Sequence, residues 1–149
     1  MRPLLRLVPV DPPTSGGSGA AGPGTKPTNG NRATPTVLVV EDEILVRMPL
    51  AEFLRDSGYR VIEAANAADA QAVFKAGQPI EAVFSDVHMP GAMNGVGLAD
   101  WVQREYPGVQ IILSSGVDTT AADRKGILFL PKPFSFDVLA RHLKRLLGG

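Results

Sequence analysis

Short apolar strands that alternate with helical stretches constrain the fold of this 149-residue chain more than any other feature. The first, at residues 36–40, is an unbroken run of β-branched and apolar residues, which is typical of a strand covered on both faces. The pattern predicts five strands, at residues 36–40, 60–63, 82–86, 109–113 and 127–130. Strands that alternate with helices in this way indicate a parallel sheet with helices on both faces.

Helices are predicted between and after these strands. Residues 44–56 place Val46, Leu50 and Leu54 at helical spacing, and Pro49 inside this pattern is expected to bend the helix or shorten its start. Further helices are expected from the Asn66 cap towards residue 77, at residues 98–106, at residues 118–124, and from residue 135 onward. The rule that crossovers are right-handed leaves few topologies for such a chain. We predict an α/β fold of the flavodoxin-like, doubly wound type, with five parallel strands in the order 2-1-3-4-5.

Residues 1–35 differ from the rest in composition. Gly, Pro, Ser, Thr, Ala and Asn dominate residues 12–35, and such a segment cannot bury enough apolar surface to offset the entropy of ordering it. We therefore predict a disordered tail at 1–35 and one domain at 36–149. A targeting segment and a misassigned start are alternatives for this basic tail.

Composition and charge exclude several classes of protein. The chain has no cysteine, which excludes disulfides and thiolate metal sites. No apolar run approaches the roughly 20 residues that a membrane helix needs. Of 15 basic and 15 acidic residues, four basic and one acidic lie in the first 35, so the predicted domain is acidic and unsuited to nucleic acid. We expect a cytoplasmic protein with no membrane or nucleic-acid partner.

Carboxylates follow the first and third predicted strands. The first strand ends in Glu41-Asp42-Glu43 and the third in Asp86, and the carboxyl ends of these strands meet at the switch point of the sheet. Neighbouring strands lie about 4.8 Å apart, so the acids should repel one another unless a cation binds among them. Mg²⁺ prefers oxygen ligands and retains several waters. We expect Asp42 and Asp86 to bind it directly and Glu41 through water.

The fourth and fifth strands bring a hydroxyl, Ser114, and an amine, Lys132, to the same edge of the sheet. Phosphoryl transfer needs positioning and charge neutralisation more than covalent chemistry from the protein. A lysine and a hydroxyl donor opposite a metal ion would meet this need. We therefore predict that Asp86 accepts a phosphoryl group and becomes an acyl phosphate.

Four segments together resemble the signature segments of response-regulator receiver domains from two-component signalling. They are VVEDE at 39–43, SDVHMP at 85–90, LSSG at 113–116 and LPKPF at 130–134. The resemblance covers residues 36 to 147. It implies that Asp86 receives its phosphoryl group from a histidine kinase or a histidine phosphotransfer protein. It also implies that Glu41 and Asp42 are the acidic pair for Mg²⁺ and that the backbone carbonyl of His88 is a further metal ligand.

The resemblance implies roles for residues of the last two strands as well. Ser114 falls at the position of the switch hydroxyl, Phe129 at that of the switch aromatic, and Lys132 at that of the family's lysine, with a cis bond before Pro133. The chain departs from the family in its short segment between Ser114 and Lys132, chiefly where the helix at 118–124 is expected. In the family, that helix, the fifth strand and the last helix form the face that reports phosphorylation, which makes it the candidate homodimer face.

The sequence ends shortly after the last predicted helix, so we expect a stand-alone receiver that signals through an unknown downstream protein or serves as a phosphate sink. We do not expect an enzyme acting on a separate substrate. One alternative is a small Mg²⁺-dependent phosphohydrolase, although Glu-Asp-Glu stands where such an enzyme would have Asp-x-Asp. A second is an interaction module that has kept the receiver fold without signalling by phosphate.

Overall fold

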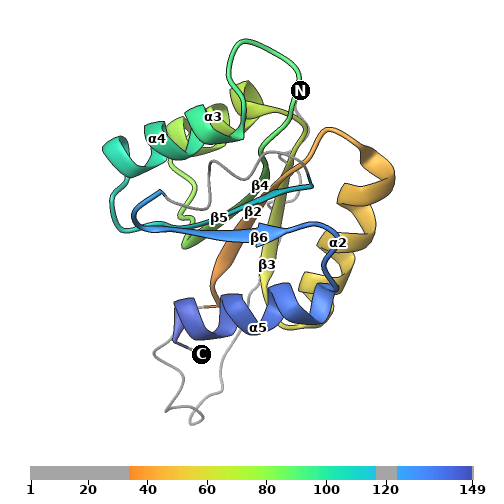
Figure 1. The fold of residues 1–149 in the computed structure, drawn as a ribbon. Coiled ribbons are helices and arrows are strands. Elements are labelled where there is room, and N and C mark those ends of the chain that lie inside the picture. Colours follow the sequence, from red (N-terminus) through yellow and green to blue (C-terminus); the bar gives the residue numbers. More distant parts are fainter. Residues whose placement is uncertain (1–33, 117–123, 149) are drawn as a thin grey trace, which may run out of the picture. The chain divides into compact units, whose positions relative to one another are not determined.

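Five parallel strands form one sheet in the order β3-β2-β4-β5-β6, which confirms the predicted order 2-1-3-4-5 (Figure 1). The strands are β2 (Thr36–Val40), β3 (Arg60–Ala64), β4 (Ala82–Asp86), β5 (Gln110–Ser115) and β6 (Ile127–Pro131). β2 and β4 lie at the centre, and their residues are buried throughout. β6 is at the edge of this sheet, with β5 as its one partner among the described strands.

The computed structural model describes residues 34–116 and 124–148. The chain divides into two units, Met1–Thr34 and Pro35–Gly149, and all described helices and strands belong to the second. The predicted disordered tail and the helix predicted at 118–124 therefore lie almost entirely outside the described residues. No described helix has the length and apolar character that crossing a bilayer requires.

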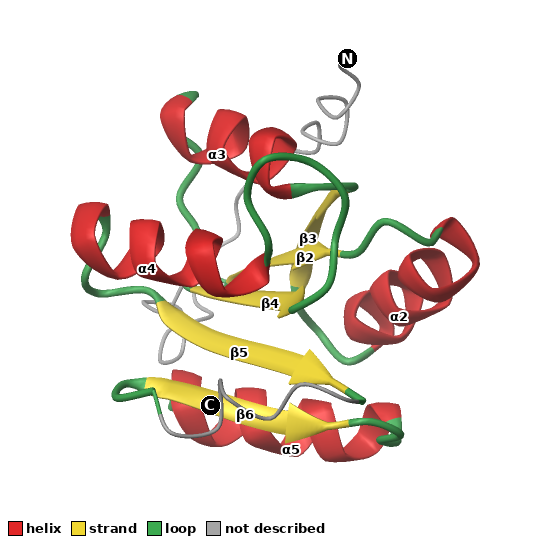
Figure 2. Cartoon of the chain, turned by 45° about the horizontal axis from the view of Figure 1, so that its top comes forward, coloured by secondary structure: helices red, strands yellow, loops and turns green. Residues whose placement is uncertain are grey.

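Four described helices cover the two faces of the sheet (Figures 1 and 2). They are α2 (Ile44–Asp56), α3 (Ala67–Lys75), α4 (Gly95–Glu105) and α5 (Phe136–Leu147). The buried side chains of α2 and α5 form one core cluster with the sheet, and those of α3 and α4 form another on the opposite face. Because the helices cover both faces of the sheet, the carboxyl ends of the strands are left as the edge where a polar site can form.

The first helix begins at Ile44 and continues through Pro49, so the proline does not shorten its start. Buried Leu50 and Leu54 anchor the turns that follow and hold the helix on the sheet. Val46 was expected on this same apolar face, but its side chain is 39% exposed. It lies on the first turn of α2, shortly after the carboxyl end of β2.

α4 begins at Gly95, three residues before the predicted start at residue 98. Asn94 caps it, because its side-chain oxygen accepts a hydrogen bond of 2.9 Å from the N–H of Gly97. The last helix has the predicted cap, with Ser135 Oγ accepting from the Val138 N–H at 3.3 Å. The other differences are small, since β3 and β6 each end one residue later than predicted and β5 spans Gln110–Ser115 instead of residues 109–113.

Candidate functional site

A polar pocket of about 290 Å³ lies at the carboxyl ends of the strands. Residues that are far apart in the sequence contribute to it, because the parallel strands end on the same side of the sheet. Its lining consists of Glu41, Asp42, Glu43, Val46, Asp86, His88 and Lys132. Every residue predicted to hold the metal lies in this lining, together with the predicted lysine.

Three carboxylates of the pocket are close enough to share one cation. Glu41, Asp42 and Asp86 each offer an oxygen, and these oxygens lie within 4.8 Å of one another. Glu41 and Asp86 are buried, with exposed fractions of 3% and 8%, whereas Asp42 is exposed. A set of hard oxygen donors with one side open to water fits Mg²⁺, which keeps part of its hydration shell.

Burial raises the pKa of Glu41, because the charged carboxylate is deprived of water. The N–H of Glu43 donates to Glu41 Oε2 at 3.0 Å and acts in the opposite direction. The neighbouring charges of Asp86 and Asp42 also raise the pKa, while that of Lys132 lowers it. The acidic cluster therefore contains electrostatic repulsion that a bound cation would relieve.

Lys132 reaches the site from the end of β6. Its Nζ lies 3.3 Å from Asp86 Oδ1, an ion pair in which the lysine side chain is 37% exposed and the aspartate 11%. The N–H of Lys132 donates to the Ser115 carbonyl at 3.1 Å, which ties this end of β6 to β5. The peptide bond between Lys132 and Pro133 is cis, as the resemblance implied.

Ser114 lies beside Asp86 in the β4–β5 register but not in the lining of the pocket. Its carbonyl accepts a hydrogen bond of 2.9 Å from the Val87 N–H. Its hydroxyl is fully buried and has no hydrogen-bond partner among the described residues. Ser114 thus lies next to the predicted acceptor in the sheet, although it is not among the residues that line the pocket.

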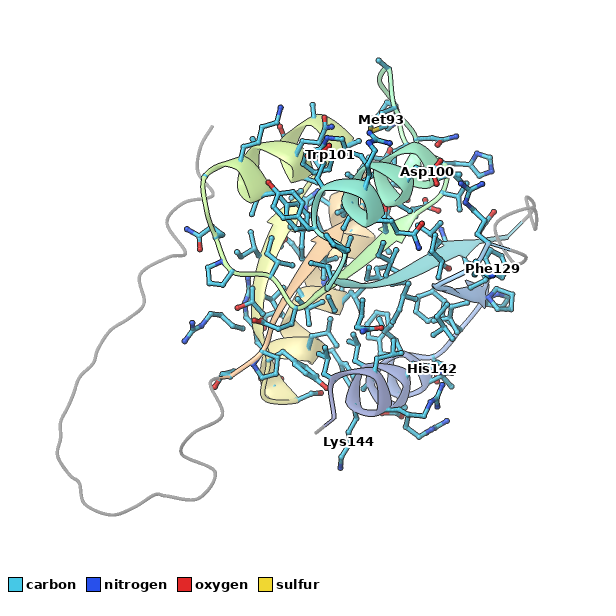
Figure 3. All side chains as sticks on the ribbon, turned by 90° about the vertical axis from the view of Figure 1, so that its left-hand side faces the viewer. Met93, Asp100, Trp101, Phe129, His142 and Lys144 are labelled. Atoms are coloured by element: carbon cyan, nitrogen blue, oxygen red, sulfur yellow. The ribbon has the colours of Figure 1, made fainter. Side chains whose placement is uncertain are left out.

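Phe129 and His88 lie where the sequence placed them, and their roles remain predictions. Phe129 is on the edge strand β6, where its half-buried ring packs against the core cluster of α3 and α4 (Figure 3). His88 is exposed and lines the pocket two residues after Asp86. Its position is compatible with a contribution from the backbone carbonyl.

Sequence reasoning missed two residues that contact the backbone of the site. Gly95 N–H donates to the Val87 carbonyl at 2.8 Å, and a Cβ at this position would lie 2.2 Å from the Asp86 carbonyl oxygen. Arg47 Nη1 donates to the Glu41 carbonyl at 2.8 Å. A glycine directly after a helix-capping asparagine was the available signal for the first, whereas the sequence offers none for the second.

Known proteins with the same features are receiver domains. The sequence profile of the response regulator receiver domain matches residues 37–144. The sensor kinase CckA of Brucella abortus (strain 2308) is 40% identical over 119 residues, which cover 75% of this chain and 12% of that protein. The transcriptional regulatory protein PdtaR of Mycobacterium tuberculosis is 36% identical over 118 residues, covering 75% of this chain and 57% of that protein. The chain thus spans only part of these curated relatives.

Solved structures agree with this match. The receiver domain from the hybrid histidine kinase CckA has a TM-score of 0.64 and 33% identity, covering 75% of this chain and 98% of that one. The receiver domain of a signal transduction histidine kinase from Syntrophus aciditrophicus has a TM-score of 0.69 and 28% identity, covering 78% and 92%. With five parallel strands, an acidic cluster and a lysine at one end of the sheet, this chain belongs to the response regulator receiver domain family.

Proposed function

We propose that this receiver accepts a phosphoryl group on Asp86 in a Mg²⁺-dependent reaction. The observation that carries the proposal is the position of the Asp86 carboxylate, which lies close both to the acidic pair Glu41–Asp42 and to the amine of Lys132. Such a site has a nucleophilic oxygen, a place for a cation and a positive charge nearby. These are the components that transfer to a carboxylate requires.

The residues of the site have separate tasks in this reaction. A carboxylate oxygen of Asp86 attacks the phosphorus, and the bond from phosphorus to the donor nitrogen breaks as the acyl phosphate forms. Lys132 Nζ, 3.3 Å from Asp86 Oδ1 before reaction, would neutralise one of the phosphoryl oxygens. Glu41 and Asp42 would hold Mg²⁺, which would neutralise charge on another oxygen.

The donor is proposed to be a histidine kinase or a histidine phosphotransfer protein. Exposed apolar side chains beside the pocket support a protein donor, because Ile44, Leu45 and Met48 on the first two turns of α2 are 50%, 86% and 50% exposed. Apolar residues gathered in this way next to polar ones are typical of sites of protein interaction. Relatives of this chain include the sensor kinase CckA and the sensor protein TorS, which is consistent with such a donor.

We further propose that this receiver is cytoplasmic and that its output is a contact with a downstream protein or the removal of phosphate from a relay. On this view it is not an enzyme with a separate substrate. Phosphorylation would draw Ser114 inward and allow Phe129 to move, and the surface around β6 and α5 would change as the population of states shifts. This surface is also the candidate homodimer face.

Electrophoresis in a phosphate-binding gel tests the assignment. Incubation of the full chain with acetyl phosphate and Mg²⁺ should produce a slower band, which EDTA prevents. Asp86→Asn should lack the band, whereas the matched control Asp69→Asn, in an exposed position on α3, should keep it. A persistent slower band in Asp86→Asn would rule out this acceptor, and repeated turnover of a small phosphoester would support the phosphohydrolase alternative.

A further inference from the structure

Arg47 connects the acidic pair to a carboxylate outside the pocket. The residue lies on the first two turns of α2, and only 15% of its side chain is exposed. Its Nη1 donates to the backbone carbonyl of Glu41 at 2.8 Å, while its Nε donates to Glu63 Oε1 at 3.1 Å. Glu63 belongs to β3, so one guanidinium joins three neighbouring elements, namely the end of β2, the helix α2 and the strand β3.

Glu63 also pairs with a second arginine, and this offers a natural comparison. Arg55, near the end of α2, donates through Nη2 to Glu63 Oε2 and to the Val61 carbonyl, each at 3.2 Å. Its side chain is 38% exposed. Both arginines therefore share one carboxylate, but of the two it is Arg47 that also bonds to Glu41.

The bond from Arg47 fixes the peptide that joins Glu41 to Asp42. The N–H of Glu41 is already bound to the Ala64 carbonyl at 3.0 Å, and Glu41 Oε2 accepts from the Glu43 N–H. With its carbonyl also held, Glu41 has its backbone fixed on both sides. The planar guanidinium binds two acceptors in a fixed relative direction, which a lysine ammonium cannot reproduce. The orientation of the Asp42 backbone is set by the same peptide.

The charge of Arg47 is compensated by Glu63, with which it forms an ion pair at 3.1 Å. Because Glu63 neutralises its charge, the guanidinium can lie beside the acidic cluster without strongly repelling a cation in the pocket. Groups that orient metal ligands from outside the coordination sphere commonly influence metal affinity by 10–100-fold.

We propose that Arg47, held in place by Glu63, is a positioning residue that preorganises Glu41 and Asp42 for a divalent cation. This inference rests on the proposed function, because it assigns to Arg47 a part in binding the Mg²⁺ that the function requires. Arg47 would act through the backbone and would touch neither the cation nor the phosphoryl group.

Calorimetric titration with MgCl₂ tests the inference in the full chain. Arg47→Met should raise the Kd for Mg²⁺ about tenfold or more. Arg55→Met removes the other arginine bound to Glu63 and should leave the Kd within about twofold of the wild-type value. Glu63→Gln, which keeps an acceptor but loses the charge, should have an intermediate effect. In EDTA, amide spectra should show larger shifts at residues 41–43 in Arg47→Met than in Arg55→Met.

Equal Mg²⁺ affinities in folded Arg47→Met and Arg55→Met would overturn the inference and leave the proposed function intact. Failure of the wild-type chain to bind Mg²⁺ would instead count against the proposed function. If Arg47→Met does not fold, Arg47→Lys supplies the same test, because it keeps the positive charge but cannot reproduce the two directed bonds. Its Kd should also rise, and an unchanged value would overturn the inference.

Discussion

Ser114 and Asp86 are partners in the register of β4 and β5, yet the buried Ser114 hydroxyl finds no hydrogen-bond partner within residues 34–116 and 124–148. An unpaired buried hydroxyl costs stability, because it has lost its bonds to water. Under the proposed function, the phosphoryl group on Asp86 would supply the missing acceptor. The unsatisfied Ser114 hydroxyl therefore lies beside Asp86, the residue on which its proposed acceptor, the phosphoryl group, would form.

Ser114→Ala should leave the free energy of unfolding unchanged or raise it by up to about 1 kcal/mol, because it removes this unpaired hydroxyl. Ser85→Ala provides the contrast, since Ser85 Oγ donates to the Asp86 carbonyl at 2.9 Å and its loss should cost about 1 kcal/mol. Urea denaturation measures both values. With beryllofluoride as a phosphoryl mimic, Ser114→Ala should also show smaller amide shifts in β6. Equal destabilisation by the two substitutions would contradict this account.

Gly95→Ala should destabilise the protein by about 1–3 kcal/mol, as overpacking of a tight site usually does. The added Cβ would lie 2.2 Å from the Asp86 carbonyl oxygen and 2.8 Å from the Val87 Cα, so the start of α4 would have to move away from β4. Phosphorylation by acetyl phosphate should slow as well, because Asp86 is the last residue of β4. Gly108→Ala is the control, with no atom within 4 Å of its Cβ, and should have little effect on either measurement.

Glu41→Gln should raise the melting temperature in EDTA at pH 7. Because the pKa of Glu41 is raised by burial, the folded state binds more protons than the unfolded chain between the two pKa values. The free energy of unfolding contributed by this group therefore falls as the pH increases through that window. The advantage of Glu41→Gln should shrink as the pH is lowered towards 4.5, the ordinary glutamate value, and should be lost below it. Melting curves from pH 4 to pH 7 would show this trend, and a constant difference would contradict it.

Leu45→Glu should change the free energy of unfolding by no more than about 0.5 kcal/mol, because this side chain is 86% exposed. Labelling by acetyl phosphate should be unaffected, since a small donor needs no docking surface. Transfer from a panel of purified, autophosphorylated histidine kinases and phosphotransfer domains should be slower. Ala72→Glu places the same charge on an exposed position of α3 and should leave transfer unchanged. Equal transfer to both variants would exclude this part of α2 from donor binding.

The strand order and the gathering of acids could be predicted because both follow from local patterns. Apolar runs marked the strands, and the rules of parallel topology then brought Glu41, Asp42, Asp86 and Lys132 to one end of the sheet. No detailed side-chain geometry was needed for this step. The roles of these residues could not come from periodicity, and they were inferred from the chemistry of carboxylates, Mg²⁺ and phosphoryl transfer together with the resemblance to a family.

Other features depend on contacts that a periodic pattern does not contain. Helical spacing placed Val46 on the buried face, but the helix begins beyond the strand ends and leaves this residue at the pocket. The start of α4 was predicted too late because Gly95 and Gly97 are poor helix formers. The helix nevertheless begins at Gly95, where Asn94 caps it and where a glycine is needed for the close approach to the Asp86 backbone. The pairing of Arg47 with Glu63 joins a helix to a neighbouring strand, a contact that sequence spacing alone does not reveal.

The pocket is formed by the ends of interior strands and of the edge strand β6, so its acidic residues and its lysine can change independently. The carboxylates proposed to hold the cation lie at or just after the ends of the interior strands β2 and β4, whose apolar side chains belong to both cores. Lys132 follows β6, which has a single neighbour among the described strands. Under the proposed function, substitutions along β6 would change the lifetime of the acyl phosphate more than the affinity for magnesium, which would let the duration of a signal differ between related proteins while its chemistry is kept.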